Sequence, residues 1–102
     1  MAGFAMQNIV SIEEPYNPAQ LNLIIYPNPT ENGFWISGNI NSNETIKVEL
    51  IDMIGRSVYQ ETLPACSELN HRVNTSFYAN SVYLIKVSTG TSSFTQRVII
   101  QK

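Results

Sequence analysis

The sequence predicts an all-β domain, a two-sheet antiparallel β-sandwich that is immunoglobulin-like and has about seven strands. Short runs rich in Val, Ile, Tyr, Phe and Trp recur from residue 21 onward at intervals of about 8 to 12 residues, with turn-forming residues between them. No stretch carries the repeat of an amphipathic helix. A chain of 102 residues is long enough to bury one core and leaves no room for a second domain.

The predicted strands are taken in chain order. They are LNLIIY (21–26), FWISG (34–38), TIKVELID (45–52), RSVYQE (56–61), LNHRVN (69–74), VYLIKVS (82–88) and SFTQRVIIQ (93–101). All are short, and all except LNHRVN contain two or more β-branched or aromatic residues, which are enriched in strands. The Cys…Trp…Cys pattern of antibody domains is absent because the chain has a single cysteine.

The first strand runs into Tyr26-Pro27-Asn28-Pro29-Thr30. Each proline ring fixes its own φ and biases the preceding residue away from helix, which predicts a stiff, extended corner. Proline lacks a backbone donor, so the corner should leave an edge strand or join one sheet to the other. We expect it to separate the preceding arm from the sandwich and to hold the first strand at a fixed angle, with no ligand chemistry at Asn28.

The second strand brings in Trp35, the only tryptophan of the chain. Core or interface packing is the expected use of Trp35 and of the tyrosines, because large aromatic side chains dominate such contacts. Stacking against a sugar ring is the alternative. The tyrosines concerned are Tyr16, Tyr26, Tyr59, Tyr78 and Tyr83.

The third and fourth strands should form a hairpin. Ile46, Val48 and Leu50 alternate onto one apolar face, and Asp52 and Gly55 then occupy the first and fourth positions of a predicted type I turn. Gly55 is expected to adopt a positive φ.

The fifth strand (69–74) is followed by a second predicted hairpin. Tyr83, Ile85 and Val87 alternate onto one face of the sixth strand, and Phe94, Val98 and Ile100 do so in the seventh. The polar run from Ser88 to Ser93 separates these last two strands. The order of the strands within the sheets is not predicted.

Residues 1–20 form a predicted linker or arm, because they contain Pro15, Pro18 and an acidic pair without sustained periodicity. Residues 1–3 are set aside as a candidate expression scar. The first residues lack the basic start of a signal peptide, so if the protein is exported, its export signal is expected upstream of them.

Composition disfavours several functional classes. The net charge is −2 and the six basic residues are scattered, so no nucleic-acid partner is expected. Cys66 and His71 are the only cysteine and histidine, which leaves no internal disulfide, no zinc site and no catalytic pair with a third group at a suitable spacing. We therefore expect a protein that is not an enzyme, with no catalytic residue, cofactor or metal.

Four motifs in order, from about Ile25 to Lys102, resemble the type A C-terminal sorting domain of the Bacteroidetes type IX secretion system. They are Pro27-Asn28-Pro29, Leu50-Ile51-Asp52 with Gly55-Arg56, Val82-Tyr83-Leu84-Ile85-Lys86-Val87, and Arg97 to Lys102. The match departs at Ser81, where family members carry glycine. If that position needs a left-handed conformation, either Ser81 carries a steric cost or Asn80 adopts the conformation instead.

The resemblance implies a non-catalytic signal at residues 21–102 that carries cargo from the periplasm through an outer-membrane translocon to the cell surface or beyond. A surface sortase would then remove it, with residues 1–20 as the cleavage region. The implied partners are the translocon, the sortase and an upstream cargo domain in the same chain. Structural roles go to Pro27, Asn28, Pro29, Asp52, Gly55 and Arg56.

Residues 93–102 are the hypothesised recognition surface, through strand addition to unpaired backbone groups. Arg97 and Lys102 would supply charge, Val98 and Ile100 would pack inward, and Ile99 and Gln101 would face outward. The full predicted recognition set is Val82, Tyr83, Lys86, Val87, Arg97, Val98, Ile99, Ile100, Gln101 and Lys102. An exposed final strand also makes an edge-to-edge homodimer a candidate state. The alternatives are a passive immunoglobulin-like spacer or adhesion module and a carbohydrate-binding module.

Overall fold

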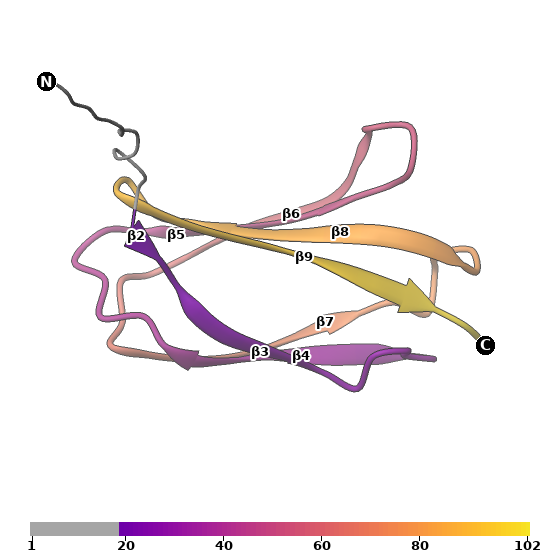
Figure 1. The fold of residues 1–102 in the computed structure, drawn as a ribbon, viewed down its shortest axis with the longest axis horizontal. Coiled ribbons are helices and arrows are strands. Elements are labelled where there is room, and N and C mark those ends of the chain that lie inside the picture. The colour runs from indigo at the N-terminus through magenta and orange to yellow at the C-terminus, as the bar shows by residue number, and fades with distance from the viewer. Residues whose placement is uncertain (1–18) are drawn as a thin grey trace, which may run out of the picture.

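The computed structural model describes residues 19–102, and these residues form a two-layer sandwich of strands (Figure 1). The strands are β2 (Ala19–Gln20), β3 (Asn22–Tyr26), β4 (Gly33–Asn39), β5 (Ile46–Ile51), β6 (Ser57–Leu63), β7 (Glu68–Asn74), β8 (Ser81–Ser88) and β9 (Ser92–Ile100). All seven predicted strands are confirmed, and the described part of the chain contains no helix. Accordingly, it offers no helix long and apolar enough to cross a membrane.

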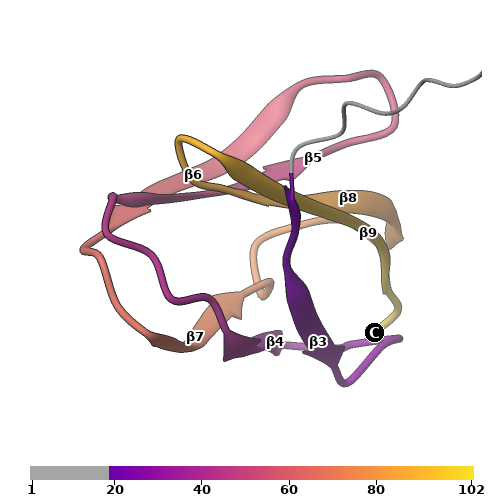
Figure 2. The same cartoon turned by 60° about the vertical axis from the view of Figure 1, so that its left-hand side comes forward.

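One layer is a five-stranded sheet in the order β2-β9-β8-β5-β6, and the other is a three-stranded sheet in the order β3-β4-β7. The seven longer strands pair antiparallel, as predicted. The two-residue strand β2 was not predicted and pairs parallel to β9. Figure 2 shows the chain leaving β2 beside β9 and crossing to the other layer as β3.

The core lies between the two sheets and follows the period-two alternation of the sequence. The predicted inward faces of β5 and β8 are buried, and so are Val98 and Ile100 of β9. β6 contributes no fully buried side chain. The buried apolar residues are Leu23, Ile25, Phe34, Ile36, Ile40, Ile46, Val48, Leu50, Leu69, Val73, Tyr83, Ile85, Val87, Val98 and Ile100.

Both predicted hairpins are confirmed. In the β5–β6 turn, the Gly55 amide donates to the Asp52 carbonyl at 3.0 Å and Gly55 has a φ of 90°. The Asp52 carboxylate accepts from the backbone amides of Ile54 and Arg56, at 3.1 and 2.8 Å. It also accepts from the Arg56 Nε at 3.0 Å. Asp52 therefore organises the turn through its charge as well as its shape.

This turn makes the stability of the domain depend on pH. The backbone hydrogen bond from Arg56 is the main cause that lowers the pKa of the Asp52 carboxyl below its ordinary value of 3.8. A carboxyl whose pKa is lower in the folded state than in the unfolded state stabilises the fold at pH values above its unfolded-state pKa. This stability is lost as the pH falls through its folded-state pKa. Asp52→Asn should therefore melt below wild type at pH 7, and the gap should close as the pH falls below about 3.8. Thermal melts of both proteins from pH 7 to pH 2 measure this gap, and a gap that stays constant would contradict the assignment.

The Pro27-Asn28-Pro29 segment leaves edge strand β3, as predicted, but two of its expected features are wrong. The segment is bent rather than extended, and both X-Pro peptide bonds, Tyr26–Pro27 and Asn28–Pro29, are cis. It also follows the first strand of the three-stranded sheet instead of separating an arm from the sandwich. The reason is that the segment returns to the other layer, where Thr30 forms a parallel bridge with Ile100 of β9.

Candidate recognition surface

The predicted recognition residues divide between the two faces of the five-stranded sheet. Tyr83, Val87, Val98 and Ile100 lie in the buried core, so a partner that binds the folded domain cannot reach their side chains. Val82, Lys86, Arg97 and Ile99 alternate with them and lie on the outer face. The predicted set therefore mixes side chains of the inner and outer faces of one sheet, and only those of the outer face can contact a partner.

These outward residues form one continuous patch, called here the β8–β9 face. It consists of Val82, Leu84, Lys86, Thr95, Arg97 and Ile99, and the strand register places Val82 opposite Ile99, Leu84 opposite Arg97, and Lys86 opposite Thr95. Leu84 and Ile99 are 41% and 39% exposed. Leu84 is missing from the predicted recognition set, although the alternation that places Val82 and Lys86 on this face also predicts its position.

The β8–β9 face and its margin on β5 are positively charged. Lys86 lies opposite Glu49 of β5, and Lys47 lies two residues from Glu49 on the same outer face. Hydrogen bonding from Ser57 is the largest cause that lowers the pKa of Glu49, with smaller contributions from Gln60 and from Lys47 and Lys86. This area has a net charge of +2, from the three cations Lys47, Lys86 and Arg97 and the one anion Glu49, whereas the net charge of the whole chain is −2. An apolar pair bordered by cations suits a partner surface that carries acidic groups around an apolar patch.

The outer edge of β9 is closed where we expected unpaired backbone groups. The Asn28 carboxamide donates to the Arg97 carbonyl at 2.9 Å and accepts from the Ile99 amide at 3.0 Å. Thr30 continues the pairing, since its amide donates to the Ile99 carbonyl and its carbonyl accepts from the Gln101 amide, both at 2.8 Å. Strand addition along residues 97–101 is therefore blocked by the chain itself. Nothing in the sequence pattern indicated this role of Asn28.

Removal of the Asn28 side chain should open this edge. Asn28→Ala deletes two exposed hydrogen bonds, which should lower the free energy of unfolding by about 1 kcal/mol. Hydrogen exchange of the Ile99 amide should accelerate about fivefold if this loss of about 1 kcal/mol falls entirely on the local opening that exposes the amide. Asn39→Ala, at an exposed asparagine of β4 that belongs to neither bond, is the matched control. Unchanged exchange at Ile99 in Asn28→Ala would contradict the proposed closure.

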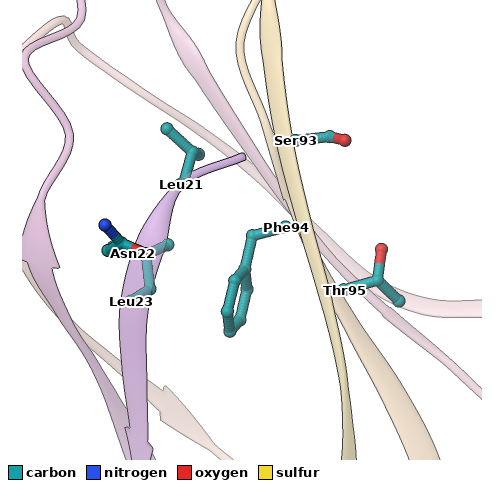
Figure 3. A pocket seen from close by; sticks show the side chains of 6 residues that line it. All are labelled: Leu21, Asn22, Leu23, Ser93, Phe94 and Thr95. Atoms are coloured by element: carbon teal, nitrogen blue, oxygen red, sulfur yellow. The ribbon is translucent and has the colours of Figure 1, made fainter. Parts of the chain in front are cut away.

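A short gap remains between β2 and the Asn28 contact. The Leu21 amide donates to the Ser93 carbonyl at 3.4 Å. The next residue of β9 whose backbone N–H and C=O point toward this strand edge is Thr95, and these two groups have no partner among residues 19–102. An open cleft of about 370 Å³ lies here, lined by Leu21, Asn22, Leu23, Ser93, Phe94 and Thr95. Figure 3 shows the Phe94 ring pointing from β9 toward β3. The open part of the edge thus comprises the backbone of Thr95 and the amide of Arg97.

The last residues are fixed to the β7–β8 loop rather than to the β8–β9 face. The Lys102 ammonium donates to the carbonyls of Ser76 and Tyr78, at 2.8 and 2.6 Å, and the Lys102 amide donates to the Asn80 Oδ1 at 3.1 Å. Neither Asn80 nor Ser81 has a positive φ, so serine fits at the position of the family glycine without that strain. Lys102 is exposed, and its ammonium is bound to carbonyls of the β7–β8 loop.

His71 takes part in a contact between the two sheets. Its Nε2 lies 3.1 Å from the Tyr59 hydroxyl and 3.4 Å from the Glu61 Oε1, both on β6. Tyr59 also donates to Glu61, and partial burial is the main cause that raises the pKa of Tyr59 well above its ordinary value. Within residues 19–102, no group of three or more His, Cys, Asp and Glu side chains could hold a metal ion.

Comparison with known families adds one result. The family model described as "Secretion system C-terminal sorting domain" matches residues 24–101. No curated protein matches the sequence significantly. The matched range begins within β3 and ends at the residue after β9, so it includes β4 to β9 and the whole β8–β9 face but not β2.

Proposed function

The chain belongs to the family of secretion system C-terminal sorting domains, and from this membership we propose that residues 21–102 act as a non-catalytic address for the type IX translocon. Family membership implies association with the type IX secretion machinery, an upstream cargo region, and export to the cell surface or the extracellular space. We propose further that the cargo passes through the periplasm in transit and that the translocon binds the β8–β9 face.

The observation that carries this proposal is the composition of the β8–β9 face. Leu84 and Ile99 expose apolar surface, and Lys86 and Arg97 add two positive charges beside them on the same two strands. An exposed apolar patch with a charged margin is the usual form of a protein docking site. Electrostatic attraction would orient an acidic partner before the apolar contacts form.

Side chains, rather than the strand edge, should carry the recognition. Asn28 and Thr30 occupy the outer edge of β9 from Arg97 to Gln101, so a partner would first have to displace them to add a strand there. The same closure disfavours an edge-to-edge homodimer through the end of β9. We propose a partner that lies flat across β8 and β9 and leaves the edge contacts in place.

Residues 1–20 are proposed as the linker to the cargo and as the region that a surface sortase cleaves. An accessible extended segment is what a processing enzyme needs. Residues 1–18 lie outside the described part of the chain, so this assignment rests on composition and on family membership. Ala19 and Gln20, the last two residues of this range, form β2 and pair with β9.

The test uses a neutral reporter fused upstream of residues 4–102 in a bacterium with an active type IX system. The variant Lys86→Gln/Arg97→Gln removes both charges from the face, and Leu84→Ser removes its apolar centre. Arg72→Gln is the matched control, because Arg72 is an exposed cation on the opposite sheet. Thermal melts of each purified variant establish that it folds.

Export of the reporter should fall about tenfold in the double charge variant, which corresponds to about 1.4 kcal/mol of binding free energy. Leu84→Ser should also reduce export, and Arg72→Gln should not. Normal export of both face variants would refute the assignment of the β8–β9 face while leaving the sorting function intact. A mass spectrum of the exported reporter tests the cleavage proposal, which predicts a new end within residues 1–20.

A further inference from the structure

The outer face of the three-stranded sheet carries an exposed aromatic pair. Tyr26 of β3 lies directly opposite Trp35 of β4, and their side chains are 46% and 37% exposed. Tyr83 packs in the core, one of the two uses expected of the aromatic residues, whereas Tyr26 and Trp35 lie outside it and are open to the other expected use, an interface, or to sugar stacking. Alternation explains the difference, because Phe34 and Ile36 take the inward positions on either side of Trp35.

A cation lies beside this pair. Arg72 of β7 is opposite Trp35 on the other side of β4. A Cβ atom placed on Gly33 would lie 2.5 Å from the Arg72 Nη2, so the guanidinium occupies the space above Gly33 that any other residue would fill. The only salt bridges within residues 19–102 join Asp52 to Arg56 and Glu61 to His71, which leaves Arg72 without a carboxylate partner in this region.

Most other side chains of this face are polar and uncharged, and one carboxylate, Glu68 of β7, lies opposite Asn39 at the end of β7 away from Asn74. The strand register puts Ser37 opposite Asn70, Asn22 opposite Asn39, and Gly33 opposite Asn74 on the same face. Side-chain amides and hydroxyls both donate and accept hydrogen bonds, as the hydroxyl groups of a sugar do.

We propose that this face binds an anionic saccharide, and we call Tyr26, Trp35 and Arg72 the aromatic–arginine site. The aromatic rings would stack against the C–H face of a pyranose, and Arg72 would pair with a carboxylate or phosphate on the sugar. The unpaired guanidinium is the feature that selects an anionic sugar over a neutral one. The site lies on the opposite layer from the β8–β9 face, so occupancy of one does not exclude the other.

The single tryptophan makes the site directly observable, because all tryptophan fluorescence of the protein comes from Trp35. The full chain is titrated with oligogalacturonate in buffer containing a chelator, and then with the same oligomer after complete methyl esterification. Esterification removes the negative charge but keeps the sugar backbone. Arg72→Gln and Tyr26→Ala are the site variants, and Lys86→Gln on the other layer is the control.

Oligogalacturonate should change the Trp35 emission in a saturable way, and the esterified oligomer should bind at least tenfold more weakly. Arg72→Gln should lose this discrimination, Tyr26→Ala should weaken both oligomers, and Lys86→Gln should bind like wild type. Absence of a saturable change, equal affinity for both oligomers, or wild-type behaviour of Arg72→Gln would each overturn the proposal. Sedimentation that shows a self-associated chain with Trp35 already covered would also overturn it, by identifying a second copy as the occupant.

Discussion

Phe34→Ala is expected to lower the free energy of unfolding by about 3–5 kcal/mol, because it removes an aromatic side chain from a closed core and leaves a cavity. Phe34 is the largest fully buried side chain of the described residues and lies on β4, between the two sheets. Domains of this size have total stabilities of about 5–15 kcal/mol. Denaturant unfolding should show a large shift of the midpoint, and the melting temperature should fall by more than about 10 °C.

The chain contains a matched control for this substitution. Phe77 in the β7–β8 loop is 88% exposed, so Phe77→Ala makes the same chemical change without opening a cavity. Its effect should stay within about 0.5 kcal/mol, as for most surface substitutions. Similar losses in the two variants would contradict the placement of Phe34 in the core.

Gly38→Ala is expected to cost about 2–6 kcal/mol, from backbone strain and steric overlap together. Gly38 has a φ of 153°, which side chains of L-residues rarely allow. A Cβ atom there would lie 2.4 Å from the Asn22 carbonyl oxygen and 3.0 Å from the Leu23 Cδ2. Because the first of these contacts is backbone, β3 would have to move away from β4. Denaturant unfolding measures the loss.

Gly55→Ala separates the two contributions to this effect. Gly55 also has a positive φ, but nothing lies within 4 Å of a Cβ atom placed on it. Its replacement should therefore cost only the strain, about 1–2 kcal/mol. An effect of Gly38→Ala no larger than that of Gly55→Ala would show that the close approach of β3 to β4 does not constrain the sheet.

Alternation along the sequence predicted most of the fold, because one face of each sheet is buried and a shift of one residue would expose that face. It therefore located Ile46, Val48 and Leu50 as well as Tyr83, Ile85 and Val87 in the core. The same rule could have separated the core and surface members of the predicted recognition set. It also places Leu84 on the β8–β9 face, where the structure has it.

Features that depend on contacts between distant segments were not predictable in this way. Asn28 pairs with Arg97 and Ile99, which lie about seventy residues later in the chain. The order of strands, the parallel pairing of β2 with β9, and the position of Arg72 over Gly33 depend equally on tertiary structure. Each of these affects the candidate sites, since Asn28 closes the β9 edge and Arg72 places a cation beside Trp35.

The sandwich thus serves as a scaffold with two different outer faces. The β8–β9 face combines apolar and cationic groups, which suits a protein partner, whereas the aromatic–arginine site combines stacking, amide and cationic groups. Both are made of side chains on strands whose opposite faces build the core. Substitutions on either face can therefore be tested without large losses of stability.

The most direct test of the sorting function is the fate of a neutral reporter fused upstream of residues 4–102, in a bacterium with an active type IX translocon and in an otherwise identical strain that lacks it. We expect reporter at the cell surface or in the medium of the first strain only. Retention of a folded fusion in the periplasm of both strains, or equal export from both, would contradict it.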